Sequence, residues 1–147
     1  MPDAAVISPR LAAIVAALPL QPHLRVLEIG CGPGAAARAI ADRLSTGHVL
    51  AIDRSDAAIR LLRAGSAEQL ASGRLRARRV AIEDLTLADD EEPFDLVVAI
   101  RVGALDGRHP RAGARAMDRI AAVTHPHARL FVDGGQPLRE LPVHRRT

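Results

Sequence analysis

Aromatic residues are almost missing from this sequence of 147 residues, which has no tryptophan, no tyrosine and two phenylalanines. Proteins that hold single-stranded nucleic acid stack its bases on aromatic side chains, and this chain offers few. Lysine is also absent, so arginine supplies all 20 basic side chains, and the formal net charge is only +3. The densest basic segment, residues 74–79, reads as the exposed side of a strand rather than as a nucleic-acid patch. We therefore do not expect nucleic acid as a partner.

Cysteine is nearly absent as well. The single Cys31 excludes an internal disulfide and fits a reducing cytoplasm. No apolar run reaches the roughly 18 residues of a membrane span, and the start of the chain lacks the basic segment of a signal peptide. His125 and His127 flank a proline but fall short of the three or four ligands of a zinc site, so a plain turn is the better interpretation. We expect a cytoplasmic protein with no membrane partner and no metal.

What the chain does contain is an alternation of short apolar segments with helical ones. Such an alternation is typical of a three-layer, Rossmann-like α/β fold with a mostly parallel sheet. We expect one domain over residues 1–147, with an N-terminal helix and lead-in at 1–22 and an irregular tail at 134–147. The strands are predicted at residues 24–29, 48–52, 75–82, 94–100 and 129–133, and the later helices at 35–44, 55–64, 67–71 and 112–123.

A glycine-rich loop follows the first predicted strand. Gly30, Gly32 and Gly34 let the backbone turn tightly and let a ligand approach the main chain. The helix that comes next points its N-terminus at the same space, where free amides favour a negative group. The loop is therefore the candidate cofactor site.

Two cofactors compete for this loop. Gly30, Gly32 and Ala35 fit the dinucleotide pattern G-x-G-x-x-G/A, with Asp53 placed to bind a ribose. Against NAD, the charge of Glu28 would repel a pyrophosphate, and Pro33 removes an amide from the phosphate cradle. S-adenosylmethionine (SAM) fits better, because loop amides suit its carboxylate and Glu28 suits its positive charges.

The residues in and around this loop resemble a known family. VLEIGCGPG, residues 26–34, looks like the first motif of class I SAM-dependent methyltransferases, and AIDRS, residues 51–55, like the second. The third and fourth motifs are matched more loosely by AIEDL, residues 81–85, and FDLVVAIRVGAL, residues 94–105. The resemblance implies SAM as cofactor and a strand order of 3-2-1-4-5. The cofactor-binding residues that it implies are Glu28, Gly30, Cys31, Gly32, Gly34, Asp53, Arg54, Ile82, Glu83 and Arg101.

Within that set, the resemblance implies that Asp53 binds both ribose hydroxyls and that Arg54 borders the adenine. Relatives often place an aspartate near the adenine amino group, where this chain has Ala81. Glu83 or Asp84 would then take its place, or the adenine would be held by packing against Ile82 and by the Ile82 amide.

The family sheet ends in an antiparallel pair after the fifth strand. Only fourteen residues come after Asp133, so we expect most or all of that pair to be missing. The bare edge of segment 129–133 would then need a cover. A symmetric homodimer could supply it, or Leu138, Leu141 and Val143 could fold back as an irregular cover.

The sequence thus predicts a SAM-dependent methyltransferase acting on a small-molecule acceptor. A non-catalytic SAM-binding or partner-scaffolding domain is the first alternative, and an NAD-dependent enzyme is the second. His109 is the candidate general base, with Arg101 and Asp106 nearby; a solvent-exposed loop histidine is the plainer interpretation.

Overall fold

The computed structural model describes residues 6–105 and 108–145, in which helices and strands largely alternate. The helices are α1 (Pro9–Ala17), α2 (Ala35–Ala41), α3 (Asp56–Gly65), α4 (Ala67–Ser72) and α5 (Pro110–Ala122). The strands are β1 (Arg25–Ile29), β2 (His48–Asp53), β3 (Leu75–Arg79), β4 (Phe94–Ala99), β5 (Thr124–Asp133) and β6 (Leu138–Leu141). Two short 3-10 helices, η1 (Ile82–Asp84) and η2 (Gly103–Leu105), come after β3 and β4.

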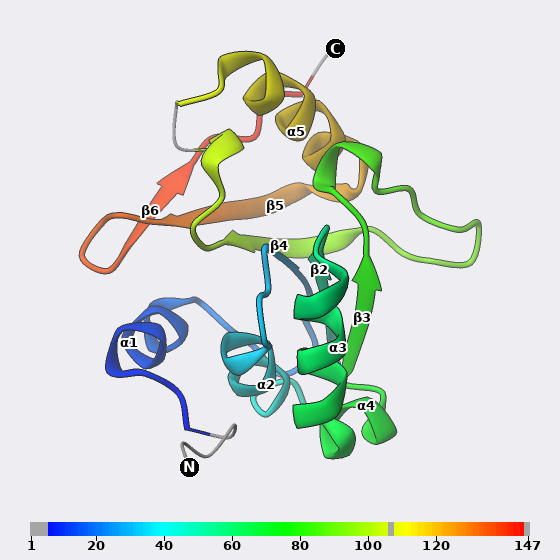
Figure 1. The fold of residues 1–147 in the computed structure, drawn as a ribbon. Coiled ribbons are helices and arrows are strands. Elements are labelled where there is room, and N and C mark those ends of the chain that lie inside the picture. The colour runs from blue at the N-terminus through cyan, green and yellow to red at the C-terminus, as the bar shows by residue number, and fades with distance from the viewer. Residues whose placement is uncertain (1–5, 106–107, 146–147) are drawn as a thin grey trace.

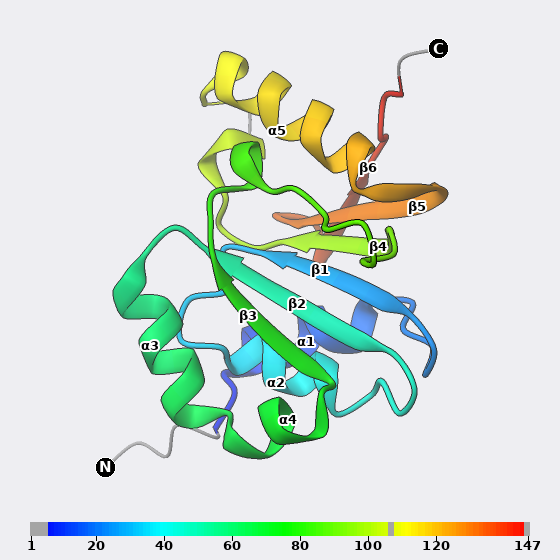
Figure 2. The same cartoon turned by 90° about the vertical axis from the view of Figure 1, so that its right-hand side faces the viewer.

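The strands form one sheet in the order β3-β2-β1-β4-β5-β6, and the first five are mutually parallel (Figure 2). The predicted Rossmann-like α/β class and the order 3-2-1-4-5 are confirmed. β1 lies between β2 and β4, with Glu28 opposite Ala51 on one side and Val98 on the other. The glycine loop that leaves β1 therefore opens at the middle of the sheet.

The last strand corrects the sequence prediction. Residues 138–141 form β6, which pairs antiparallel with β5 from Asp133↔Leu138 to Leu130↔Leu141. The expected loss of the terminal antiparallel pairing is not confirmed, and the irregular tail predicted at 134–147 contains a strand. The turn is made through Gly134, whose φ of +106° suits glycine. Because β6 covers the edge of β5, the main reason for expecting a homodimer is gone.

The helices cover both faces of the sheet. The helices α1 to α4 lie on one face and α5 on the other, which gives three layers (Figure 1). Neighbouring side chains of a strand point to opposite faces, so Val26 packs in the core under α1 and α2, and Leu27 packs in the core under α5. β1 is buried on both faces, as expected of a central parallel strand.

Local signals set most helix boundaries. The hydroxyl of Ser8 accepts a hydrogen bond from the Leu11 amide at 3.2 Å and begins α1, and Ser55 caps α3 by accepting one from Ala58 at the same distance. Gly73 ends α4 in the left-handed conformation. These start and stop residues confirm the predicted helices. Among the described residues, no helix has the length and apolar character needed to cross a membrane.

Two strand boundaries differ from the prediction. β3 ends at Arg79, because the chain turns into η1 after the Val80 amide donates to the Asp53 carbonyl at 3.0 Å. β5 begins at Thr124, five residues before the predicted start at residue 129. Its register against β4 shifts between Phe94 and Leu96. The segment 125–128, expected to be a plain turn, lies in this irregular stretch. Pro126 is tolerated there because a bulge leaves an amide position unpaired.

Candidate functional site

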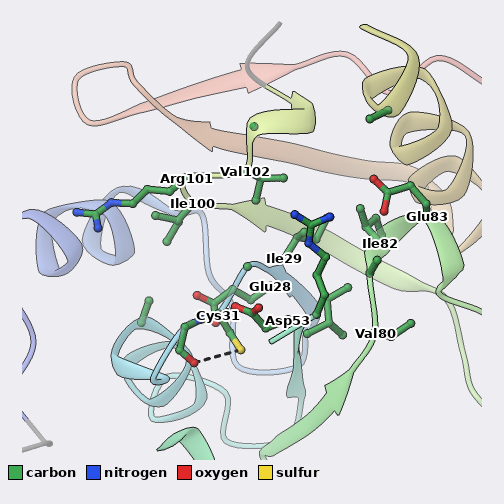
Figure 3. A pocket seen from close by; sticks show the side chains of 18 of the residues that line it. Glu28, Ile29, Cys31, Asp53, Val80, Ile82, Glu83, Ile100, Arg101 and Val102 are labelled. Carbon is green, nitrogen blue, oxygen red and sulfur yellow. Dashed lines mark hydrogen bonds between the residues drawn. The ribbon is translucent and has the colours of Figure 1, made fainter. Parts of the chain in front are cut away.

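A cavity of about 820 Å³ opens at the carboxyl ends of β1, β2 and β4 (Figure 3). This is the place where parallel α/β sheets bind ligands. Its lining includes all the predicted site residues except Gly34, namely Glu28, Gly30, Cys31, Gly32, Asp53, Arg54, Ile82, Glu83, Arg101 and His109. The structure thus brings together residues that lie up to 81 positions apart in the chain.

Two glycines of the loop have different tasks. At Gly32, φ is +54° and an added Cβ would meet nothing within 4 Å, so the loop leaves open space on its cavity side. At Gly34, φ is +96° and a Cβ would lie 2.7 Å from Leu62 Cγ of α3. Gly34 therefore packs the loop against the fold, whereas Gly32 borders the ligand space.

The Asp53 carboxylate holds the loop in place. Its Oδ2 accepts a hydrogen bond from the Gly32 amide at 3.0 Å, and its Oδ1 accepts one from the Ser55 amide at 2.9 Å. Sequence reasoning missed this structural task. A carboxylate offers about four acceptor positions, so both oxygens keep capacity for a ligand hydroxyl.

Glu28 is the most unusual group in the cavity wall. Its side chain is 1% exposed, and its Oε1 has no hydrogen-bond partner in the part of the chain that the structure describes. Burial, together with the nearby Asp53 charge, raises the pKa of Glu28 to about 8, although Arg38 opposes the shift. The carboxyl group is therefore mostly protonated at neutral pH, and a cation placed beside it would favour its ionisation.

Arg38 is a residue that sequence reasoning missed. It is buried in α2, and its Nη1 donates to the Pro33 carbonyl at 3.1 Å and to Ser66 Oγ at 3.0 Å. These bonds tie the glycine loop to the junction of α3 and α4. The available signal was an arginine on the apolar, alanine-rich face of the helix, where a charge needs internal partners.

Val80, Ile82 and Glu83 line one end of the cavity, beside η1 (Figure 3). Ile82 is buried, Glu83 is half-buried, and Arg54 is exposed at the end of β2. Cys31 lies under the loop, and burial raises the pKa of its thiol, with Glu28 and Asp53 adding to the shift. Its Sγ donates to the Gly32 carbonyl at 3.6 Å, so the thiol is an inert wall group.

The opposite end is formed by the loop that leaves β4. Arg101 adopts a positive φ of 59°, and its amide donates to Asp133 Oδ1 at 3.0 Å. Asp133 Oδ2 accepts from Arg10 of α1 at 2.5 Å, so one carboxylate fixes both segments. His109 is exposed at the N-terminus of α5, and Asp106 lies outside the described residues.

Clusters outside the cavity are engaged in ordinary contacts. Three of the four arginines in residues 74–79 bind the chain itself: Arg74 donates to Ser72 Oγ at 3.2 Å, Arg78 pairs with Glu91 at 3.1 Å, and Arg79 donates to the Arg54 carbonyl at 3.2 Å. Within residues 6–105 and 108–145, no three His, Cys, Asp or Glu side chains come together as a metal site.

Comparisons with known proteins agree with this geometry. A family model described as "Methyltransferase domain" matches residues 26–127. Three solved structures share the fold. Coclaurine N-methyltransferase bound to N-methylheliamine and S-adenosylhomocysteine (SAH) has a TM-score of 0.65 at 18% identity. The [4+2]-cyclase SpnF has a TM-score of 0.68 at 26% sequence identity. Magnesium protoporphyrin IX methyltransferase from Synechocystis PCC 6803 with bound SAM has a TM-score of 0.63 at 22% sequence identity. No curated protein matches this chain in sequence.

These structures are longer than the chain. The alignment with coclaurine N-methyltransferase covers 83% of this chain but only 34% of that structure. The corresponding values are 84% and 43% for SpnF, and 83% and 55% for the magnesium protoporphyrin IX methyltransferase. The family match spans well over half of the chain, from β1 into β5. It confirms the predicted class I methyltransferase domain and, with it, SAM as the expected cofactor. The chain belongs to the methyltransferase-domain family.

Proposed function

We propose that residues 1–147 act as one unit that binds SAM in this cavity and transfers its methyl group to a small-molecule acceptor. SAM supplies a methyl group already activated by its sulfonium, so the protein's main tasks are to align the reactants and to exclude water. Asp53 would accept hydrogen bonds from the ribose hydroxyls. Ile82 and Glu83 would border the adenine, and the loop around Gly32 would hold the methionine part.

One observation carries the proposal: the buried, unpartnered carboxyl group of Glu28 in the cavity wall. A buried polar atom without a partner is costly, and native proteins seldom leave one without a purpose. The ammonium and sulfonium of SAM are positive groups that would stabilise an ionised Glu28. The pyrophosphate of NAD would instead place negative charge near it, which argues against the dinucleotide alternative.

Fewer residues of the chain point to the methyl acceptor than to the cofactor. Coclaurine N-methyltransferase and magnesium protoporphyrin IX methyltransferase act, by their names, on small molecules, which supports a small acceptor here. An acceptor that must lose a proton would use His109, the one imidazole on the cavity wall among the described residues. A cytoplasmic location remains an inference from the single cysteine.

The chief alternative is a domain that binds SAM without transferring its methyl group. It is favoured by the length comparison, since the chain spans 55% or less of the three longer structures. SpnF, named as a cyclase, is an example of a shared fold with a different reaction.

Titration of the purified chain with SAM, SAH and NAD tests the cofactor part of the proposal. We expect SAM and SAH to bind and NAD not to bind. Incubation with SAM carrying a labelled methyl group, together with a panel of small acceptors, then tests transfer. NAD binding in the absence of any SAM signal would overturn the proposal.

Removing the Asp53 carboxylate should weaken SAM binding strongly. Asp53→Ala loses the charge-assisted hydrogen bonding to the ribose, worth about 1.5–3 kcal/mol in total, so we expect the Kd for SAM to rise roughly ten- to a hundredfold. The structure adds a second effect, because the Gly32 and Ser55 amides also lose their acceptor.

Calorimetric titration of Asp53→Ala gives the affinity, and urea denaturation gives the loss of folding stability. Asp56→Ala is the matched control, because Asp56 is an exposed carboxylate three residues away that pairs with Arg60. An unchanged Kd in Asp53→Ala would show that the ribose is held elsewhere.

A further inference from the structure

A second cavity of about 440 Å³ adjoins the first. Arg101, Val102 and Arg108 line both, so the two spaces meet at the loop that leaves β4. This loop lies against the glycine loop that is proposed to hold the methionine part of SAM, because a Cβ added at Gly30 would be 3.1 Å from Val102 Cγ2. The second cavity is therefore where an acceptor could reach the methyl group, an assignment that rests on the proposed function.

The polar lining of the second cavity is dominated by arginine. Arg101 comes from the end of β4, Arg108 from the segment before α5, and Arg139 from β6; Asp133 is the only acid among the described lining residues. The guanidinium of Arg108 lies over η2, since a Cβ added at Gly103 would be 3.1 Å from Arg108 Nη2. Two parts of the chain that are distant in sequence, the connection between β4 and α5 and the strand β6, thus bring positive charge to one small space.

Asp133 does not neutralise this charge. Its Oδ1 already accepts the Arg101 amide at 3.0 Å, and its Oδ2 is paired with Arg10 at 2.5 Å. Arg139 stands opposite Val132 in the β5–β6 ladder, is exposed, and has no hydrogen bond or ion pair with any described residue. Its neighbour Glu140 pairs instead with Arg129 at 2.8 Å. Arg139 therefore offers an open guanidinium to the cavity.

The rest of the wall is apolar. Ala99, Leu105 and Val132 are buried, and Val102 is half-buried. A ligand that matches this wall has an apolar body and an anionic head. Guanidinium groups bind carboxylates and phosphates through paired N–H donors, which suits such a head.

We infer that the acceptor is a small organic anion, an apolar body with a carboxylate or phosphate head, and that Arg139 binds this head in the second cavity. Arg101 and Arg108 add positive charge around it. β6, the strand that sequence analysis missed, supplies the specificity residue of the acceptor site.

Benzoate, phenyl phosphate and benzamide test this inference on the full chain, with and without saturating SAH. Chemical-shift titration of the Arg101, Val132 and Arg139 amides reports occupation of the second cavity. We expect benzoate or phenyl phosphate to give saturable shifts, and benzamide, the neutral isostere, to bind at least tenfold more weakly. Binding of either anion supports the inference, and the tighter of the two identifies the head group.

Arg139→Gln should weaken binding of the preferred anion about tenfold and leave SAH affinity unchanged. Arg60→Gln is the matched control, because it removes the same charge from an exposed position on α3. Equal binding of benzoate, phenyl phosphate and benzamide, absence of saturable shifts, or equal effects of the two variants would overturn the inference.

The same titrations separate this inference from the proposed function. A chain that binds SAH but no anion refutes the anionic acceptor alone. Anion binding through Arg139 without SAH binding supports the anion site and refutes the proposed function.

Discussion

Gly32→Val should abolish SAM binding while the chain remains folded. An added Cβ at Gly32 meets no protein atom within 4 Å and borders the cavity, so the branched side chain would occupy the space proposed for the methionine part of SAM. Overlap with a ligand is not relieved by small shifts, because the loop is held by Asp53 and Arg38. We expect the Kd to rise beyond about a thousandfold, the equivalent of roughly 4 kcal/mol.

The control must separate ligand exclusion from backbone strain. Gly32 has a φ of +54°, where a β-branched residue is strained. Gly73 matches it closely: its φ is +79°, an added Cβ also meets nothing within 4 Å, and it lies at the end of α4 away from the cavity. Gly73→Val should lose similar stability but keep SAM affinity. Normal SAM binding by Gly32→Val, measured by calorimetry, would show that the loop is not the cofactor site.

Glu28→Gln should stabilise the empty protein at alkaline pH and weaken SAM binding at the same time. The folded pKa of about 8 lies above the ordinary value of 4.5, so the folded state holds a proton that the unfolded chain has released. The contribution of Glu28 to wild-type stability therefore falls as pH rises from 4.5 to 8, by about 1.4 kcal/mol for each unit of difference between its two pKa values. Glutamine carries no such proton, so the variant escapes this loss.

Urea denaturation across that pH range checks the stability effect. The two proteins should be similar below pH 4.5, and the variant should gain steadily until the difference levels off above pH 8. The variant should also bind SAM roughly ten- to a hundredfold more weakly, because glutamine offers no carboxylate to the positive groups of SAM. Glu68→Gln, on the first turn of α4, is the charge-matched control. Parallel stability curves for wild type and Glu28→Gln would contradict the buried, protonated state of Glu28.

Local sequence signals predicted most of the residues that line the first cavity. The glycine loop comes after an apolar strand, and Asp53 ends the next one, so a parallel sheet brings both to one edge whatever the rest of the chain does. The cavity wall contains every predicted site residue apart from Gly34. Gly34 is not part of the cavity wall, and sequence spacing does not tell which glycine faces the cavity and which packs against Leu62.

The missed features depend on contacts between distant segments. β6 is four residues long, and Pro137 and Pro142 stand just outside its ends, where proline disfavours the continuation of a strand. Its identity as a strand comes only from pairing with β5. Arg38 likewise shows its role only when Ser66, 28 residues away, is brought beside it. Contacts between distant segments, and not local sequence preferences, therefore determine the strand β6 and the role of Arg38.

The number of protons released on SAM binding tests the central role of Glu28 most directly. Glu28 is mostly protonated near neutral pH in the protein without ligand and should ionise beside the ligand's positive charge. Calorimetric titration at about pH 7, in two buffers of different ionisation enthalpy, gives the proton count. We expect SAM to bind wild type with release of close to one proton, Glu28→Gln to release none, and NAD not to bind. SAM binding with the same proton count in both proteins would contradict the role assigned to Glu28.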